Sequence, residues 1–170
     1  GGTNDQNLLI WDGIKMYHSG HFFGLISAFN PYLTENVTIT KNGTSAQYND
    51  AVSGTINMES VNTIAKKPFG GVGFNLLSVD AYGQIPISKK VAIQFSGRRS
   101  ITDLLDTPTF EQYFKRAFQD SKITTQTNPS DSEIDNTSDF NFFDYNLKLL
   151  YNFNKNHKLR LNLLNVENNL

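Results

Sequence analysis

The sequence contains no cysteine, which excludes disulfide-stapled scaffolds and zinc sites built on cysteine. Its formal net charge is only −1 and its basic residues occur in short runs, so the electrostatic footprint of a nucleic-acid-binding protein is missing. No long apolar run is present and the mean hydropathy is −0.39, which excludes a membrane-spanning helix. Strands of a membrane-spanning barrel are still compatible with this composition, because half of their residues are polar.

The chain also lacks an initial methionine and a signal peptide. Its first residues, GGTNDQNLLIWDGIKMYHSGHFFG, form a glycine-rich stretch of α/β character that begins in the middle of a motif. We therefore expect the chain to be a segment of a longer protein.

The second half of the chain contains short segments in which apolar and polar residues alternate. In the segment 77–85 the odd positions are apolar or small and the even positions are polar. The segments 91–98, 143–154 and 158–163 repeat the pattern with few exceptions. Successive side chains of a strand point to opposite faces, so each segment is predicted to be a strand with one apolar and one polar face.

A change of phase predicts one more strand. Val72, Phe74 and Leu76 are apolar at even positions, whereas from Leu77 onward the apolar positions are odd. An uninterrupted strand cannot change face, so we place a tight connection around 76–80. Residues 67–87 then form two strands of about the 9–11 residues that cross a bilayer when tilted.

The connections between these strands are unequal in length. Lys89-Lys90 and the segment 154–157 are short polar turns, but a long polar connection runs from Ser100 to Asp139. Long loops are unusual inside compact domains, whereas transmembrane barrels pair short periplasmic turns with long extracellular loops. Within this loop Thr109–Asp120 has apolar residues at helical spacing, and the simplest interpretation is a short helix that packs on its own loop.

The first part of the chain is predicted to form a mixed sheet with little helix. We expect a loop at Tyr17–Phe23 and a short helix at Gly24–Phe29 that ends at Asn30-Pro31, because the residue before proline disfavours the α region. The expected strands are Asn7–Trp11, Asn36–Lys41 and Gly54–Glu59.

Several motifs of this part occur in a recognisable order. They are Gly1-Gly2, LLIWDG at 8–13, VTITKNG at 37–43 with Gln47-Tyr48-Asn49, and SGTINM at 53–58. This order resembles the C-terminal half of the plug domain of TonB-dependent outer-membrane receptors, with its Asp-Gly-Val/Ile-Pro, VEVxKGPxSxxYG and GGxINIxTK elements. FGGVGFNLLSVDAYGQIPIS and VAIQFSGRRS resemble the first barrel strands of the same receptors, so the resemblance covers essentially the whole chain.

The chain departs from the family pattern at three places. Lys15 replaces the proline after DGI, Asn42 stands at a usual glycine, and Asn49-Asp50 replaces the glycine after Tyr48. Asn and Asp tolerate positive φ better than other residues, so we expect the turns to be preserved.

The resemblance implies an α+β plug segment at 1–62, followed by five antiparallel transmembrane β-barrel strands at 67–170 with an extracellular loop at about 100–139. The chain would be a fragment of a 22-stranded plugged barrel. Since plugs join the barrel on the periplasmic side, both short polar turns are expected to be periplasmic. The first half of the plug, the TonB box and most of the barrel would lie outside the chain.

The function implied is active import of a cargo, such as a siderophore, glycan or peptide, across the outer membrane of a Gram-negative bacterium. The expected partners are the TonB complex, which would engage a plug segment absent from this chain, outer-membrane lipid and lipopolysaccharide, and the cargo itself. One alternative is a SusC-like importer with a surface lipoprotein lid. Another is a soluble β-sandwich binding module, which would bury its apolar stripe under a second sheet.

Candidate substrate contacts lie in the loop that the family places at the plug apex, and they are Tyr17, His18, His21 and Phe22. The two histidines near Asp12 have a spacing compatible with a metal, but polar tips on a loop are the simpler interpretation, and no metal or cofactor is expected. Ser19 lacks the context of a nucleophile elbow, and Asp103 and Asp106 fit a turn better than an acid/base pair, so no catalytic residue and no enzyme are expected.

The alternation also assigns faces. Arg98 is predicted to face the lumen and Arg99 the outside, where a guanidinium suits lipopolysaccharide phosphates. Gly71 and Gly73 share the lumen-facing parity and are expected to let the plug approach closely. The residues predicted to face lipid are Val79, Ala81, Ile93, Phe95, Tyr145, Leu147, Leu149, Leu161 and Leu163. Those predicted to face the lumen or plug are Asp80, Gln94, Asn146, Lys148 and Arg160.

Overall fold

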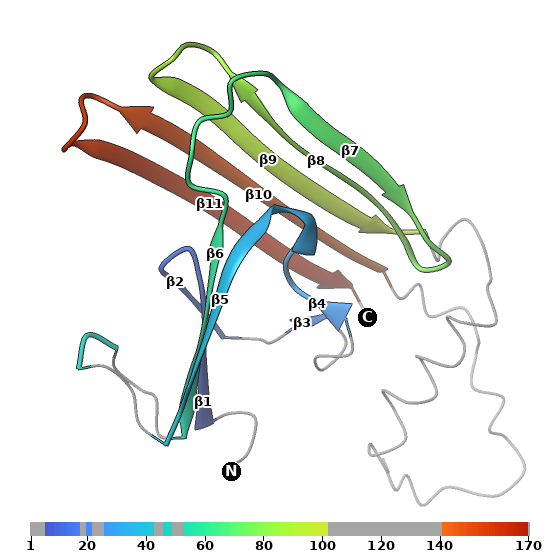
Figure 1. Cartoon of the computed structure of the whole chain (residues 1–170). Coiled ribbons are helices and arrows are strands. Elements are labelled where there is room, and N and C mark those ends of the chain that lie inside the picture. Colours follow the sequence, from blue (N-terminus) through green and yellow to red (C-terminus); the bar gives the residue numbers. More distant parts are fainter. Residues whose placement is uncertain are drawn as a thin grey trace, which may run out of the picture.

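The computed structural model describes residues 6–17, 20–21, 26–42, 46–48, 53–101 and 141–169. They form a four-stranded sheet near the N-terminus, a five-stranded sheet that follows it, and a two-stranded ribbon (Figure 1). We call the first two the N-terminal sheet and the C-terminal sheet. No described residue is in an α-helix, so this part of the chain is almost entirely β-structure.

The N-terminal sheet is mixed, as predicted, with the strand order β2-β1-β6-β5. Its central strands β1 and β6 run parallel, and both edge strands pair antiparallel to them. The strands are β1 (Asn7–Trp11), β2 (Ile14–Met16), β5 (Thr34–Lys41) and β6 (Gly54–Ser60). The run NLLIW of β1 has few polar residues. β1 lies inside the sheet and pairs in parallel with β6, and such strands are usually buried on both faces.

A two-residue turn of Asp12 and Gly13 joins β1 to β2. Both residues have positive φ, 47° and 83°, which a type I′ hairpin turn requires and which Asp-Gly favours. Asn42, at the end of β5, also adopts a positive φ of 59°, as expected for asparagine at a usual glycine position. Asn49 and Asp50 lie outside the described residues.

The predicted helix at Gly24–Phe29 is wrong at residues 26–27, which form strand β4 (Ile26–Ser27) paired with β3 (Gly20–His21). The helical turn comes later, as the 3-10 helix η3 (Pro31–Leu33). Asn30 therefore begins a helix instead of ending one. Its extended backbone is what both a residue before proline and an N-cap need, and its side chain accepts the Tyr32 N–H at 2.9 Å.

The C-terminal sheet is an antiparallel meander in the order β11-β10-β9-β8-β7. Its strands are β7 (Phe69–Phe74), β8 (Ser78–Pro86), β9 (Val91–Ser100), β10 (Asn141–Asn152) and β11 (Lys158–Asn169). All five predicted strands are present, and the predicted change of phase is a turn at 75–77. There the Asn75 side chain accepts the N–H groups of Leu77 and Ser78 at 2.8 and 2.9 Å. The loop 102–140, with its predicted helix, lies outside the described residues.

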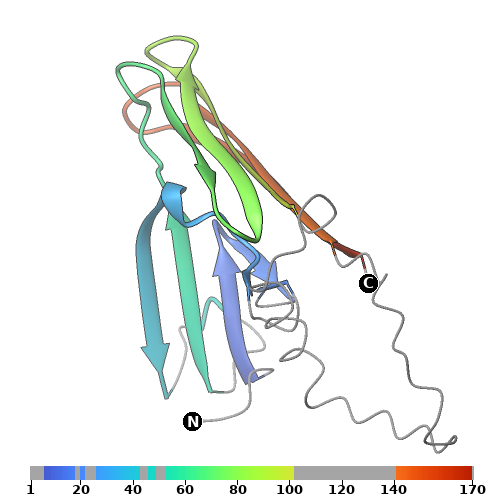
Figure 2. The same cartoon turned by 90° about the vertical axis from the view of Figure 1, so that its right-hand side faces the viewer.

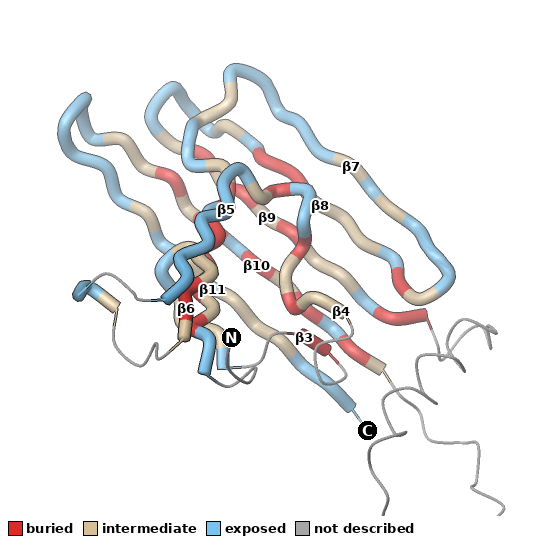
Figure 3. Tube along the Cα trace, turned by 60° about the horizontal axis from the view of Figure 1, so that its bottom comes forward, coloured by how far each residue is buried: buried red, intermediate tan, exposed pale blue. Residues whose placement is uncertain are grey.

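The two faces of the C-terminal sheet differ sharply in burial (Figure 3). The N-terminal sheet lies on one side of it, and we call this side the inner face (Figure 2). Inner-face Gln94, Asn146 and Lys148 are at most 5% exposed. On the outer face Leu161 and Leu163 are 55% and 54% exposed. The alternation therefore predicted the two faces correctly, and it is the polar face that is buried.

The layers meet through some ring contacts, such as Tyr32 of η3 stacked on Tyr82 of β8 with centroids 4.9 Å apart. Within the N-terminal part, Trp11 is buried and stacks on Phe29 with ring centroids 5.2 Å apart. From the C-terminal sheet Ala92 and Leu150, which are opposite each other on β9 and β10, are fully buried. Most of the remaining buried inner-face residues are polar, so hydrogen bonds and ion pairs position the two sheets.

Candidate functional site

The best-organised site in the described residues is a buried polar cluster between the two sheets, centred on Asp12. The type I′ turn directs the Asp12 carboxylate at the last residue of β6. Its Oδ1 accepts the Ser60 N–H at 2.9 Å, and its Oδ2 accepts the Ser60 hydroxyl at 2.5 Å. The Asp12 N–H in turn donates to the Met58 carbonyl at 2.9 Å, so Asp12 is bound to β6 through both its main chain and its side chain.

Lys148 of β10 supplies the positive charge of this cluster. Its Nζ lies 3.2 Å from Asp12 Oδ1 and 3.0 Å from Ser60 Oγ, and the side chains of Lys148 and Asp12 are 2% and 5% exposed. A lysine is almost never buried so completely unless it is paired. The ion pair joins β10 to the first turn of the N-terminal sheet.

The Ser60 hydroxyl makes three hydrogen bonds. It donates to Asp12, and it accepts from Lys148 and from Gln94 Nε2, the latter at 3.1 Å. A hydroxyl has one donor and two acceptor positions, so every hydrogen-bonding position of Ser60 is satisfied. Since Ser60 is 1% exposed, this geometry is closed to solvent.

The cluster continues into the connection between the sheets, residues 61–68. Gln84 Nε2 donates to Gln94 Oε1 at 3.2 Å and to the Thr63 carbonyl at 3.0 Å, and Gln84 Oε1 accepts the Ala65 N–H at 2.6 Å. Arg160 of β11 donates to the Asn62 side chain at 2.6 Å and to its carbonyl at 3.1 Å. Strands β8 and β11 therefore both hold the connection.

A second cluster surrounds His21 at the other end of the sheet. His21 is fully buried, with Nε2 3.0 Å from Asp144 Oδ2 and Nδ1 2.6 Å from Asn168 Oδ1. Arg98 donates to Asp144 Oδ2 from Nε at 2.9 Å and from Nη2 at 2.7 Å, and also to the Ser27 carbonyl. Arg98 and Asp144 pair with each other across β9 and β10, and they hold the β3–β4 ribbon through the Ser27 carbonyl and the His21 ring.

The predicted substrate residues occupy different surroundings. Tyr17 is 83% exposed and accessible to a ligand, whereas the His21 ring is buried over Phe142, with centroids 4.3 Å apart. His18 and Phe22 lie outside the described residues. Substrate binding by these residues stays a prediction, and the packing gives His21 a structural task that the sequence did not indicate.

Gly71 and Gly73 do face inward, but the expected reason is wrong. A Cβ on Gly71 would lie 3.0 Å from the Tyr82 ring, and one on Gly73 would lie 2.5 Å from the Asp80 carboxylate. The space at both glycines is therefore taken by side chains of the neighbouring strand β8. Tyr82, leaning over Gly71, stacks on Tyr32 of η3 with ring centroids 4.9 Å apart.

Among the described residues, no group of three or more His, Asp or Glu side chains is placed to hold a metal ion. Asp12 is engaged by Ser60 and Lys148, and His21 by Asp144 and Asn168.

No family model, curated protein or solved structure matches the chain. The described part of the chain contains no helix that is long and apolar enough to span a membrane.

The contrast between Tyr17 and His21 gives a testable difference. Replacing His21 by Ala removes a buried partner of Asp144, so we expect a loss of about 1–3 kcal/mol in the free energy of unfolding. Tyr17→Ala at the exposed site should change it by less than about 0.5 kcal/mol. Chemical denaturation of the intact protein that carries the chain measures both, and a larger effect at Tyr17 than at His21 would contradict this packing.

Proposed function

We propose that the chain is part of a TonB-dependent outer-membrane receptor, with residues 1–62 in the plug and 67–170 in the first strands of the barrel. The receptor would bind an extracellular cargo and import it with energy delivered by the TonB complex. The observation that carries the proposal is the inversion of the C-terminal sheet, which buries its polar face and exposes its apolar face.

The inversion is unfavourable in water. Antiparallel sheets of soluble proteins pack the apolar face on the core and leave the polar face to solvent. Here Val72, Leu161 and Leu163 are more than half exposed, on the face away from the N-terminal sheet. Contiguous exposed apolar surface of this kind marks contact with a protein or a membrane, and transmembrane barrels combine an apolar outside with a polar inside. In a β-sandwich the same residues would be covered by a second sheet.

The outer face also has the layered composition of a bilayer-spanning wall. Its middle is apolar, with Leu147 paired to Phe95 and Leu163. Aromatic pairs flank it on β10, Phe143 with Tyr145 at one end and Tyr151 with Phe153 at the other. At ~3.4 Å per residue, Phe143 and Tyr151 lie about 27 Å apart along the strand. If the strand is tilted by about 40°, their separation along the membrane normal is about 20 Å. An apolar band of about 25 Å between aromatic girdles is expected for barrels.

The polar character of the layer contact supports a gating role. Transport in a plugged barrel requires the plug to move relative to the wall, and the separated surfaces must then be hydrated. Contacts such as Asp12 with Lys148 and His21 with Asp144 can exchange protein partners for water, whereas a large apolar contact would oppose separation. The contacts thus suit a reversible plug. The chain's role is binding and gating, with no covalent chemistry.

Adjacent residues of β11 provide a matched test, because the sequence has no cysteine that would react with a probe. Leu163 pairs with Leu147 on the outer face, and Leu164 pairs with Asn146 on the inner face. A fluorophore on Leu163→Cys, in the intact protein folded into vesicles, should be strongly quenched by nitroxide-labelled lipid chains. The same fluorophore on Leu164→Cys should be quenched little.

Equal quenching at both positions would remove the support for a lipid-facing outer side. A protein that folds as a soluble monomer and does not bind the vesicles would favour the soluble β-sandwich binding module instead.

A further inference from the structure

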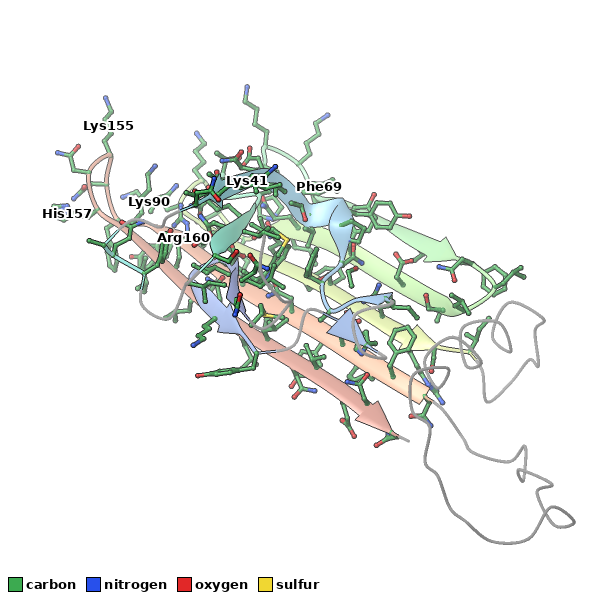
Figure 4. The ribbon with its side chains drawn as sticks, turned by 90° about the horizontal axis from the view of Figure 1, so that it is seen from below. Lys41, Phe69, Lys90, Lys155, His157 and Arg160 are labelled. Atoms are coloured by element: carbon green, nitrogen blue, oxygen red, sulfur yellow. The ribbon has the colours of Figure 1, made fainter. Side chains whose placement is uncertain are left out.

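Lysines gather at the end of the C-terminal sheet where its short turns lie. Lys89 and Lys90 occupy the β8–β9 turn, and Lys155 and Lys158 occupy the β10–β11 turn and the start of β11. All four are exposed, and Figure 4 shows Lys90 and Lys155 together with His157 at this end. We call these four lysines the basic rim. The rim continues into the connection through the exposed Lys66 and Lys67.

The rim is not neutralised by its own sheet. Among the described residues no acidic side chain forms an ion pair with the four lysines, and the acidic residues of β8, β10 and β11 lie toward the opposite ends of their strands. In the N-terminal sheet, Glu35 accepts the Asn62 N–H at 3.3 Å and Glu59 accepts from Asn36 at 3.5 Å. The rim therefore presents unbalanced positive charge.

The rim borders the apolar outer face directly. Ile87 and Phe153 stand next to the turns and are 63% and 47% exposed, and Phe153 lies 4.0 Å from the Tyr151 ring, centroid to centroid. Lys90 Nζ donates to the Phe153 carbonyl at 3.1 Å, which links the two turns. Aromatic residues followed by lysines are typical of a membrane interface, where the lysine stem covers apolar surface and the ammonium reaches the headgroups.

We propose that the basic rim binds the phosphate groups of anionic phospholipids in the membrane leaflet on the turn side. This inference rests on the proposed function and adds the headgroup chemistry to it. Lipid is favoured over an acidic protein because the lysines follow the border of the apolar face from turn to turn, as a leaflet surface would. Lipopolysaccharide is not the ligand, since it belongs to the leaflet at the loop side.

The proposal predicts a preference for phosphatidylglycerol over phosphatidylcholine near the turns. A fluorophore on Asn156→Cys, in the intact receptor that carries the chain, reports it in mixed vesicles where one lipid or the other carries a nitroxide. A lysine at an anionic surface contributes about 1 kcal/mol, or roughly a fivefold preference. Lys89→Gln with Lys155→Gln should therefore lower the preference by roughly 25-fold or abolish it. Salt at 1 M should have a similar effect, because it shortens the Debye length to about 3 Å.

Lys15→Gln with Lys41→Gln is the matched control, because it removes the same charge from the N-terminal sheet and should leave the preference unchanged. Lys89→Arg with Lys155→Arg should also retain it. Equal quenching by both lipids in the unmodified receptor, or a preference that survives Lys89→Gln with Lys155→Gln, overturns the lipid rim while the membrane placement stands. Absence of quenching by either lipid, with correctly folded receptor, overturns both proposals.

Discussion

Replacing Lys148 by Met is expected to destabilise the contact between the two sheets by about 3–5 kcal/mol. The change leaves the Asp12 carboxylate buried without its cation and removes one of the two donors to the Ser60 hydroxyl. Met has nearly the volume of Lys, so the loss reports charge and hydrogen bonding instead of packing. Chemical denaturation of the intact protein, followed by a probe in the N-terminal sheet, measures it.

The control for this variant is a second change that removes the partner charge. Asp12→Asn combined with Lys148→Met leaves no charge in this cluster, so the double variant should recover much of the loss. Comparison of the double variant with the two single variants gives the coupling energy. Lys41→Met, at an exposed lysine, should change stability by less than about 0.5 kcal/mol. A loss at Lys148→Met no larger than that at Lys41→Met would mean that the ion pair does not hold the sheets together.

Introducing Arg at Leu147 should cost about 2–4 kcal/mol in a membrane, because Leu147 lies in the middle of the apolar outer face and a charge there is removed from water. The same change near a turn should cost only about 0–1 kcal/mol, so Leu159→Arg is the matched control. The measurement is the folding free energy, in vesicles, of the intact protein that carries the chain.

The soluble alternative gives a different result. Leu147 is 45% exposed, and Arg at an exposed site of a soluble protein changes stability by about 0.5 kcal/mol or less. Equal small effects at Leu147 and Leu159 would therefore argue against lipid at the outer face. A large effect at Leu147 alone also locates the membrane midplane on β10.

The C-terminal sheet could be predicted from the sequence because its signals are local. Period-two alternation specifies both the strands and their faces, and the change of phase at Leu76 specifies a turn. The segment around Asn30-Pro31 was ambiguous, since the same dipeptide suits the end of one helix and the N-cap of another. The choice depends on whether residues 26–27 find a strand partner, and β3, a few residues earlier in the chain, supplies it.

The polar clusters could be predicted only in part. Parity assigns Lys148 and Arg98 to the inner face, but their partners come from the N-terminal sheet or from another strand, and a side chain's parity does not reveal them. Asp12 was considered only as a possible metal neighbour, and its ion pair with a residue 136 positions away follows only from the way the layers pack. His21 was treated as an exposed loop residue for the same reason.

The hydrogen bonds from Gln84 and Arg160 to residues 61–68 determine how tension would pass through a receptor of the proposed kind. A pull on the N-terminal sheet travels along β6 into this connection. Without those bonds the tension would reach β7 first and separate it from β8 one backbone bond at a time. With them, the pull is divided between β8 and β11, on both sides of the wall segment, and side-chain bonds must yield together. In such a receptor the part of the plug next to the barrel would stay in place, and the part that moves would lie nearer the N-terminus.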